Sequence, residues 1–264
     1  MAQSDCGERF DRLLKIMDQL RDPGGCPWDA KQTMETLRPY LIEEAYECLT
    51  AMEEGDRVAQ CEELGDLLLQ VVFQSRIARD EGAFSIDEVI DGICDKLVRR
   101  HPHVFADAAV DGAAGVERQW EQIKLEEKAG QASAKRSIVA GIPASAPALL
   151  RAARLGEKVS RVGLDWDDST GVRAKLDEEL GELDEALAGG NVREIQHEFG
   201  DVLFTVAQWA RHLGLEPEDT LRAATARFTS RIECIEAGLE AEGANWQQAG
   251  DVEARWQAAK EATD

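Results

Sequence analysis

The chain has 264 residues, enough for one large domain or two small ones that each bury a core. Lys and Arg total 30 against 52 Asp and Glu, and the resulting net charge of −22 excludes broad electrostatic binding to nucleic acid or to an anionic membrane. Hydrophobic residues make up 44% of the chain, which is typical of a globular protein and not of a disordered one.

Helical periodicity runs through almost the whole chain, and few segments show the alternation typical of strands. It predicts ten helices, over residues 7–21, 35–54, 57–79, 86–100, 114–128, 147–160, 172–188, 192–213, 217–241 and 250–261. Turn and cap residues agree with these boundaries, namely Gly55-Asp56 and Gly189-Gly190-Asn191 at two hairpin turns, Ser85 with Glu88 as a capping box, and Pro102 after a helix.

The stretch AGQASAKRSIVAGIPASAP, residues 129–147, is rich in small and polar residues and contains proline. Such a composition is typical of a linker between domains. We therefore expect an N-terminal helical domain over residues 1–128, a linker over 129–147, and a C-terminal helical domain over 148–264.

The two halves of the chain repeat each other. EEAYE at 43–47 returns as EELGE at 178–182, and ELGD at 63–66 returns as EFGD at 198–201, both after 135 residues. Three further matches follow the same order: Lys96 and Arg100 with Arg227 and Arg231, WEQIK at 120–124 with WQAAK at 256–260, and, more loosely, CPWD at 26–29 with LDWD at 164–167. The predicted fold is therefore all-α, with two tandem copies of one helical bundle.

Each copy carries four acids, Glu44, Glu47, Glu63 and Asp66 in the first and Glu179, Glu182, Glu198 and Asp201 in the second. Positions i, i+3 and i+4 of a helix share one face. Because the two acidic pairs of a copy are nearly equidistant from the turn, a rise of about 1.5 Å per residue brings them level across the antiparallel hairpin.

Four facing carboxylates cannot all ionise in a partly buried site without a counter-charge. Mg²⁺ and Mn²⁺ prefer oxygen ligands and supply that charge, and Mg²⁺ commonly completes its coordination with phosphate oxygens and water. The spacing therefore predicts a divalent-cation site in each copy. The alternative is a pair of solvated helix faces that form ordinary ion pairs, and the level, repeated arrangement favours the metal site.

Basic and aromatic residues repeat in the same way. Each copy has a basic pair spaced by four residues, Lys96/Arg100 and Arg227/Arg231, which suits phosphate binding. Each copy also has a tryptophan followed by a lysine, Trp120/Lys124 and Trp256/Lys260, which would place an aromatic ring and an ammonium near a nucleotide. The alternative for each of the latter pairs is a core tryptophan with a solvated lysine.

The histidines predict no metal chemistry of their own. His101 and His103 flank Pro102, where a turn that ends a helix is the better interpretation. EIQH at 194–197 matches the Glu-x-x-His of di-iron bundles, but such sites use two of these motifs and residues 59–62 of the first copy contain no histidine. Glycine-rich phosphate loops and G-x-S-x-G elbows are absent from the sequence.

Cysteine usage and the N-terminus bear on the compartment. The 6 cysteines form no C-x-x-C pair, which favours buried free thiols over zinc ligands or disulfides. The N-terminal MAQSDCGERF has no apolar h-region, and no run approaches the roughly 18 apolar residues of a membrane span. We expect a reduced, cytoplasmic protein that does not bind membranes.

The signature E-E-x-x-E followed by E-x-x-D resembles that of the MazG-type nucleoside triphosphate pyrophosphohydrolases, within the all-α NTP pyrophosphatase superfamily. The resemblance covers nearly the whole chain and rests on GGCPWDAKQT, EEAYE, EELGDLLLQVVF, DKLVRRHPHVF and WEQIK. It implies a homodimer that hydrolyses NTPs and dNTPs to the nucleoside monophosphate and pyrophosphate with Mg²⁺, for which Mn²⁺ is a possible substitute.

In two-copy members of this family the C-terminal copy is credited with the activity. The resemblance implies metal-binding and catalytic roles for Glu179, Glu182, Glu198 and Asp201, and nucleotide contacts for Lys175, Arg227, Arg231, Trp256 and Lys260. Arg227 stands where a lysine is common in the family, and it preserves the charge.

The two copies differ at one position before the acids. Lys175 lies one helical turn before Glu179, whereas the corresponding position before Glu44 is Tyr40, which cannot neutralise phosphate. We therefore expect the C-terminal copy to carry most hydrolysis, and the first copy to serve in dimer packing or weaker nucleotide binding. Two alternatives stay open: a dUTP-selective pyrophosphatase, and a non-catalytic, regulatory dimer that binds nucleotide or metal.

Overall fold

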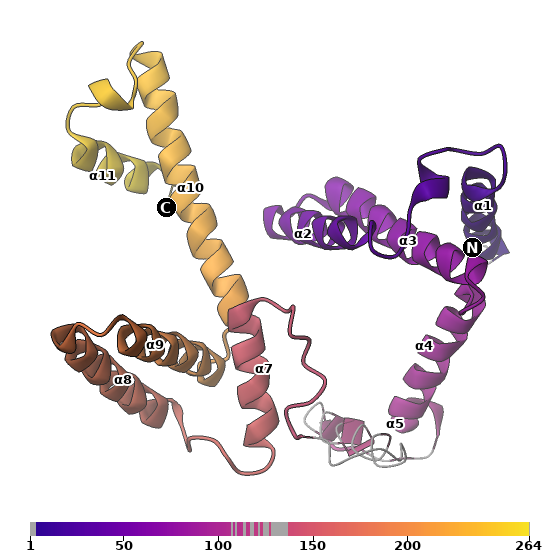
Figure 1. Ribbon diagram of the computed structural model, residues 1–264, viewed down its shortest axis with the longest axis horizontal. Helices are drawn as coiled ribbons and strands as arrows, with labels where there is room; N and C mark the ends of the chain where they lie inside the picture. Colours follow the sequence, from indigo (N-terminus) through magenta and orange to yellow (C-terminus); the bar gives the residue numbers. More distant parts are fainter. Residues whose placement is uncertain are drawn as a thin grey trace. The chain divides into compact units, whose positions relative to one another are not determined.

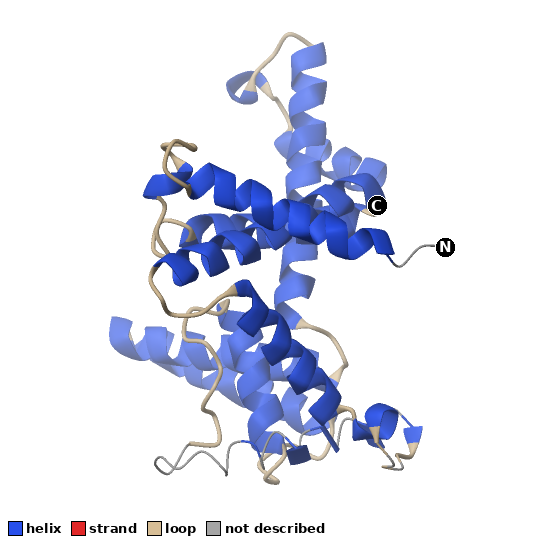
Figure 2. Cartoon of the chain, turned by 90° about the vertical axis from the view of Figure 1, so that its right-hand side faces the viewer, coloured by secondary structure: helices blue, strands red, loops and turns tan. Residues whose placement is uncertain are grey.

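The computed structural model describes residues 4–106, 108, 110–112, 115, 116, 119, 120, 122, 123, 127 and 137–263. All secondary structure in these residues is helical, as Figure 2 shows, so the predicted all-α class is confirmed. The chain divides into two compact units, Met1–Ala132 and Ser133–Asp264, and the division falls within the predicted linker 129–147. The predicted domain boundaries themselves stay a prediction.

The first unit is built around a helical hairpin (Figure 1). Its elements are α1 (Ser4–Arg21), η1 (Asp29–Lys31), α2 (Arg38–Glu54), α3 (Arg57–Asp80), α4 (Ile86–Arg100) and α5 (Pro102–Phe105). Helices α2 and α3 form the hairpin, and α1 and α4 contact α3. The core of this unit lies between α1 and α3 and contains Met17, Leu37, Val72, Phe73 and Ile77.

The second unit repeats this plan. Its elements are α7 (Ala148–Ser160), α8 (Ser169–Gly189), α9 (Val192–His212), α10 (Pro217–Ala241), η2 (Trp246–Gln248) and α11 (Val252–Thr263). Helices α8 and α9 form the hairpin, α7 packs against α9 and α10, and α11 packs against α10. A second apolar cluster, Ile235, Leu239, Ala249 and Ala259, lies between α10 and the C-terminal segment.

The helices of each hairpin end and begin at the predicted turn residues. Gly55 and Gly190 adopt left-handed conformations with φ of 71° and 70°, which glycine tolerates without strain. Asp56 then caps α3 by accepting from two backbone amides, and Asn191 caps α9 by accepting from one. The capping box of Ser85 at the start of α4 is also confirmed.

The observed helix bounds agree with the predicted ones to within about three residues, the usual scatter at helix ends. Helix α8 begins at Ser169 and not at residue 172, because the Asp168 side chain accepts from the amides of Thr170 and Gly171. Most of the predicted helix 114–128, including Lys124, lies outside the described residues. Among the described helices, none is both long and apolar enough to cross a membrane.

The contact between α7 and α9 depends on Gly156. A Cβ at this position would lie 1.8 Å from Oε1 of Gln208 and 2.9 Å from Nε of Arg211. Gln208 is 1% exposed, and its amide donates to the carbonyl of Ala152 at 2.7 Å, so it has little room to move. Only glycine therefore allows this approach.

Gly156→Ala should lower the free energy of unfolding by about 1–3 kcal/mol, because overpacking forces Gln208 from its hydrogen bonds. Urea denaturation measures the change. The matched control is Gly238→Ala in α10, where a Cβ would meet nothing within 4 Å and should stabilise the helix by about 0.5–1 kcal/mol. Equal stability of the two variants would contradict this account of α7 packing.

Candidate active site

The hairpin of the second unit brings three of the predicted acids together. Glu179 and Glu182 of α8 and Glu198 of α9 each offer a carboxylate oxygen, and these three atoms lie within 4.8 Å of one another. Glu179 is 6% exposed, whereas Glu182 is exposed and Glu198 is half-buried. One side of the cluster is therefore shielded from water and the other is open to a ligand.

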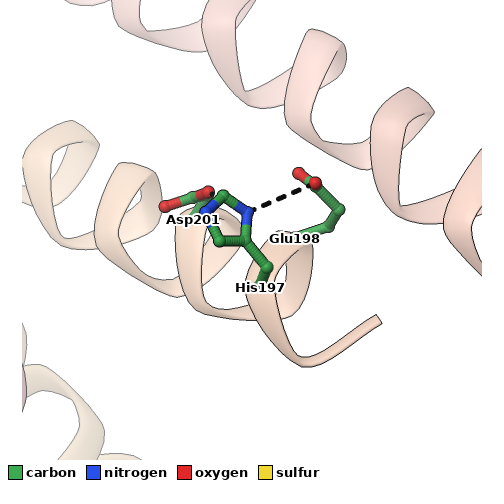
Figure 3. A group of neighbouring side chains, drawn as sticks. All are labelled: His197, Glu198 and Asp201. Atoms are coloured by element: carbon green, nitrogen blue, oxygen red, sulfur yellow. Dashed lines mark hydrogen bonds and ion pairs between the residues drawn. The ribbon is translucent and has the colours of Figure 1, made fainter. Parts of the chain in front are cut away.

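The fourth acid, Asp201, lies beside Glu198 with a histidine between them (Figure 3). Nδ1 of His197 is 3.3 Å from Oε1 of Glu198 and 3.1 Å from Oδ2 of Asp201. Sequence reasoning considered His197 only as half of a di-iron motif and missed this contact. The i, i+4 spacing of His197 and Asp201 was the available signal.

Lys175 supplies positive charge at the shielded side of this cluster. Its Nζ lies 2.7 Å from Oε1 of Glu178 and 3.0 Å from Oε1 of Glu179, and these bonds hold the pKa of Lys175 well above its usual value. Partial burial raises the pKa of Glu182, Lys175 opposes this shift, and the carboxylates of Glu179 and Glu198 add to it. The lysine therefore compensates only part of the negative charge.

The hairpin of the first unit gathers the corresponding acids. Carboxylate oxygens of Glu44, Glu47 and Glu63 lie within 4.8 Å of one another. Partial burial raises the pKa of Glu44, and Asp66, Glu47 and Glu63 raise it further. No neighbouring group lowers the pKa of Glu44, whereas in the second copy Lys175 lowers the pKa of Glu182.

Both clusters fit a hard divalent cation. The donors are carboxylate oxygens from two facing helices, which suits Mg²⁺ or Mn²⁺. Burial is the main cause of the raised pKa values of Glu44 and Glu182, and the neighbouring carboxylates of each cluster raise these values further.

Apart from Lys175 on α8, the predicted nucleotide contacts of the second copy lie on α10 and α11. The guanidinium carbon of Arg231 is 5.6 Å from the ring centre of Trp256, whose ring is also 5.3 Å from that of Phe228. Arg227 is exposed one turn before Arg231, and Lys260 is half-buried one turn after Trp256. In Figure 1 α10 runs from the end of α9 away from the α8–α9 hairpin, and α11 packs against α10.

Within the basic pair of the first copy, Arg100 has a carboxylate partner, Glu127. Nη2 of Arg100 is 2.6 Å from Oε2 of Glu127, and the guanidinium carbon of Arg100 is 5.7 Å from the ring centre of Trp120. Hydrogen bonds from Arg100 and Arg99 lower the pKa of Glu127 to about 2. Lys96 is half-buried one turn before Arg100, and Lys124 lies outside the described residues.

Each hairpin also carries an exposed apolar stripe that repeats after 135 residues. On α3 the stripe is Leu64, Leu68 and Val71, and on α9 it is Phe199, Leu203 and Val206. All six side chains are at least 40% exposed. Positions i, i+4 and i+7 form one helix face, so each stripe is a continuous surface suited to another helix.

Comparison with known proteins agrees with this arrangement. The model of the MazG nucleotide pyrophosphohydrolase domain matches the chain twice, over residues 32–105 and 168–234, so the predicted tandem copies are confirmed. The chain is 46% identical over 239 residues to the nucleoside triphosphate pyrophosphohydrolase/pyrophosphatase MazG of Thermotoga maritima, covering 90% of each chain. It is 41% identical over 260 residues to the nucleoside triphosphate pyrophosphohydrolase of Escherichia coli K12, covering 96% of this chain and 97% of the relative.

The two matched segments contain both acid clusters, and the relatives align over nearly the full chain. The similarity between this chain and its relatives therefore covers the two hairpins that carry the acid clusters as well as the helices around them. The chain belongs to the MazG nucleotide pyrophosphohydrolase family.

Proposed function

We propose that the chain hydrolyses nucleoside triphosphates, both NTPs and dNTPs, to the nucleoside monophosphate and pyrophosphate at the acid cluster of the second copy, with Mg²⁺ bound. The observation that carries this proposal is the convergence of Glu179, Glu182 and Glu198 within 4.8 Å, beside the ammonium of Lys175. The names of the Thermotoga maritima and Escherichia coli relatives support the reaction class.

The residues of the site have two kinds of proposed role, the binding of charged groups and the transfer of a proton. When bound, Mg²⁺ would supply Lewis-acid stabilisation of the charge on the leaving pyrophosphate. Glu179, Glu182, Glu198 and Asp201 would provide oxygen ligands from two helices, and one carboxylate of the cluster would accept the proton of the attacking water. Lys175, which pairs with Glu179 at 3.0 Å, neutralises phosphate charge as the substrate enters.

We further propose a homodimer in which α10 and α11 of one protomer reach the acids of the other. Two observations support it. Helices α10 and α11, which carry Arg231 and Trp256, extend away from the α8–α9 hairpin of their own unit (Figure 1), and the apolar stripe of Phe199, Leu203 and Val206 is exposed on α9. Burying this stripe against a second hairpin would stabilise the dimer by the hydrophobic effect.

One electrostatic difference favours the second copy as the main catalytic one. Lys175 stands beside the acids of the second copy, and the first copy has Tyr40 there, packed edge-on against Trp28 at 6.1 Å. The first copy then serves in dimer packing or in weaker nucleotide binding.

The reaction is tested with chelator-treated protein on a panel of NTPs and dNTPs. We expect monophosphate and pyrophosphate from each nucleotide with Mg²⁺, no turnover in excess EDTA, and recovery on adding Mg²⁺ or Mn²⁺. Chromatography identifies the products. ADP from ATP would refute the cleavage site, and turnover of dUTP alone would favour the dUTP-selective alternative. Nucleotide binding without any turnover would favour a regulatory dimer.

The assignment to the second copy is tested by matched double variants. Glu179→Ala with Glu182→Ala should lower kcat by a factor on the order of 100 or more, because charge stabilisation worth several kcal/mol is lost. Glu44→Ala with Glu47→Ala should leave most of the activity. Circular dichroism checks that both variants stay helical. The opposite ranking would move the activity to the first copy, and equal partial losses would mean that both copies work.

The homodimer proposal is tested by mixing two inactive variants. Glu182→Ala removes an acid and Arg231→Ala removes a phosphate contact, so each homodimer should be inactive. A heterodimer purified through two different tags has one site with both residues intact, and should recover about half of the wild-type kcat per dimer. If each site uses one chain only, the heterodimer has no intact site and stays inactive.

A further inference from the structure

A histidine and two carboxylates gather on α9, next to the acid cluster of the second copy. His197, Glu198 and Asp201 each offer one ligand atom, and these three atoms lie within 4.8 Å of one another. The three side chains are 73%, 22% and 46% exposed, in that order. Glu198 also belongs to the cluster with Glu179 and Glu182, so the histidine group is a second, adjoining set of ligands.

The spacing of these atoms suits a metal ion. Nδ1 of His197 is 3.3 Å from Oε1 of Glu198 and 3.1 Å from Oδ2 of Asp201 (Figure 3). Bonds from Zn²⁺ to imidazole or carboxylate are about 2.0–2.2 Å long, so two ligands lie roughly 3.0 Å apart at a right angle and about 3.4 Å apart at the tetrahedral angle. Both separations in the structure fall within this range, and the three atoms can therefore bind one cation after little movement.

The helix itself produces this grouping. His197 and Asp201 are four residues apart on α9, and Glu198 and Asp201 are three apart, so the three side chains project from one side of the helix. Zinc sites of the H-E-x-x-H type use the same spacing of four residues on a helix, and HEFGD at 197–201 has an aspartate in place of the second histidine. Aspartate is also a zinc ligand, and three protein ligands leave a fourth position for water.

The imidazole of His197 changes which cations suit the site. Carboxylates alone favour hard ions such as Mg²⁺, whereas an imidazole nitrogen favours borderline ions such as Zn²⁺ and Co²⁺. The residue 135 positions before His197 is Glu62, so the first copy has a carboxylate at this position. Within the described part of the chain, the group on α9 is the only such set of ligands that contains a histidine. The nitrogen ligand is therefore a property of the second copy.

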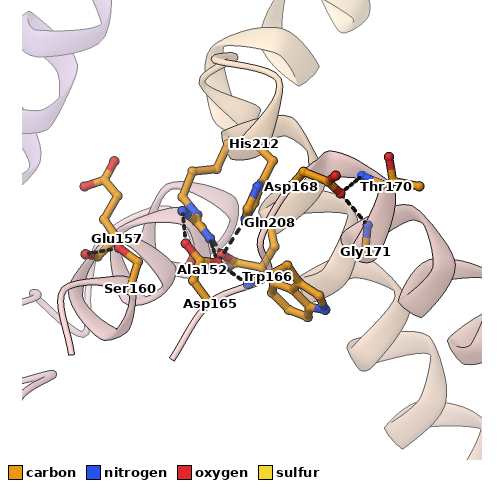
Figure 4. Close-up of polar contacts among 11 residues, drawn as sticks. Ala152, Glu157, Ser160, Asp165, Trp166, Asp168, Thr170, Gly171, Gln208 and His212 are labelled. Carbon is orange, nitrogen blue, oxygen red and sulfur yellow. Dashed lines mark hydrogen bonds and ion pairs between the residues drawn. The ribbon is translucent and has the colours of Figure 1, made fainter. Parts of the chain in front are cut away.

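The other histidine of the second copy shows that a histidine beside a carboxylate is not sufficient. Nε2 of His212 is 2.9 Å from Oδ1 of Asp165 (Figure 4). Arg211 donates to both oxygens of the same carboxylate, at 2.6 and 3.0 Å, and so supplies its counter-charge. The side chain of His212 is also only 11% exposed. His197, in contrast, contacts two carboxylates and is open to solvent.

We propose that His197, Glu198 and Asp201 bind a borderline divalent cation, Zn²⁺ or Co²⁺, and that the imidazole selects this cation over Mg²⁺. Because Glu198 has two carboxylate oxygens, it can serve this cation and a Mg²⁺ ion held by Glu179 and Glu182 at the same time. The inference concerns the free protein and goes beyond the proposed hydrolysis, which needs only the carboxylates.

NMR of the histidine side chains tests the nitrogen ligand directly. The full chain, labelled with ¹⁵N at its 4 histidines and treated with chelator, is titrated with Zn²⁺ at about pH 8, where free imidazole is neutral. Saturating Zn²⁺ should shift the Nδ1 resonance of His197, which His197→Ala identifies by its absence. The resonance of His212 should stay in place, and Mg²⁺ should shift that of His197 far less.

Competition with a fluorescent zinc indicator measures the affinity of the site. His197→Ala should raise the Kd for Zn²⁺ by about tenfold or more, because loss of even an outer-sphere partner of a metal ligand costs roughly 10–100-fold. His197→Glu, which introduces the residue of the first copy, should lower the preference for Zn²⁺ over Mg²⁺ by about tenfold. The control, Gln196→Ala, changes an exposed neighbour outside the group and should leave both affinities unchanged.

Imidazole resonances that do not respond to saturating Zn²⁺ would overturn the proposal, and His197 would then only pair with the two acids. An equal shift with Mg²⁺ would also overturn it, because the nitrogen would then respond to nearby charge without being a ligand. The same holds if His197→Ala and Gln196→Ala have the same Kd for Zn²⁺. Since these measurements use no nucleotide, a lack of NTP hydrolysis would count against the proposed function alone.

Discussion

Repulsion among carboxylates held across a helical hairpin is the constraint on which the rest of each unit depends. The hairpin places carboxylate oxygens of Glu179, Glu182 and Glu198 within 4.8 Å of one another; burial raises the pKa of Glu182, and the carboxylates of Glu179 and Glu198 raise it further. Such a cluster is costly for a folded chain unless a cation binds there. The surrounding helices therefore keep the acids aligned and leave one side of the cluster open to solvent, since Glu179 is 6% exposed whereas Glu182 is exposed.

The two copies meet this constraint differently. In the second copy Lys175 offsets part of the charge, and α7 packs closely on α9 through Gly156 and Gln208. In the first copy the acids have Tyr40 where Lys175 would be, and Phe73, at the position of Gln208, belongs to the apolar core. One copy thus combines charge compensation with a mainly apolar cavity against α9, and the other has an apolar core at the corresponding position.

Within the second unit, most of the residues expected to bind nucleotide lie on other helices than the acids. Arg231 and Trp256 are in contact on the α10–α11 segment, which extends away from α8 and α9 (Figure 1), whereas Lys175 lies beside Glu179 on α8. The exposed stripe on α9 lies beside the acids in sequence, since Phe199 follows Glu198 directly. A dimer that buries the stripe would therefore also decide which helices of the partner can reach the acid cluster.

The sequence by itself determined the helices, the turns and the pairing of the acids, because these depend on local spacing: glycine and a cap residue at each turn set the register of Glu179 against Glu198. Only the tertiary structure decided which side chains meet across helices that are distant in sequence. Asp165 bonds to Arg211, 46 residues later, and Gln208 bonds to Ala152, 56 residues earlier, and no periodicity encodes such contacts. The cavity exists only because α7 approaches α9 at Gly156, which depends on packing between segments and not on any one of them.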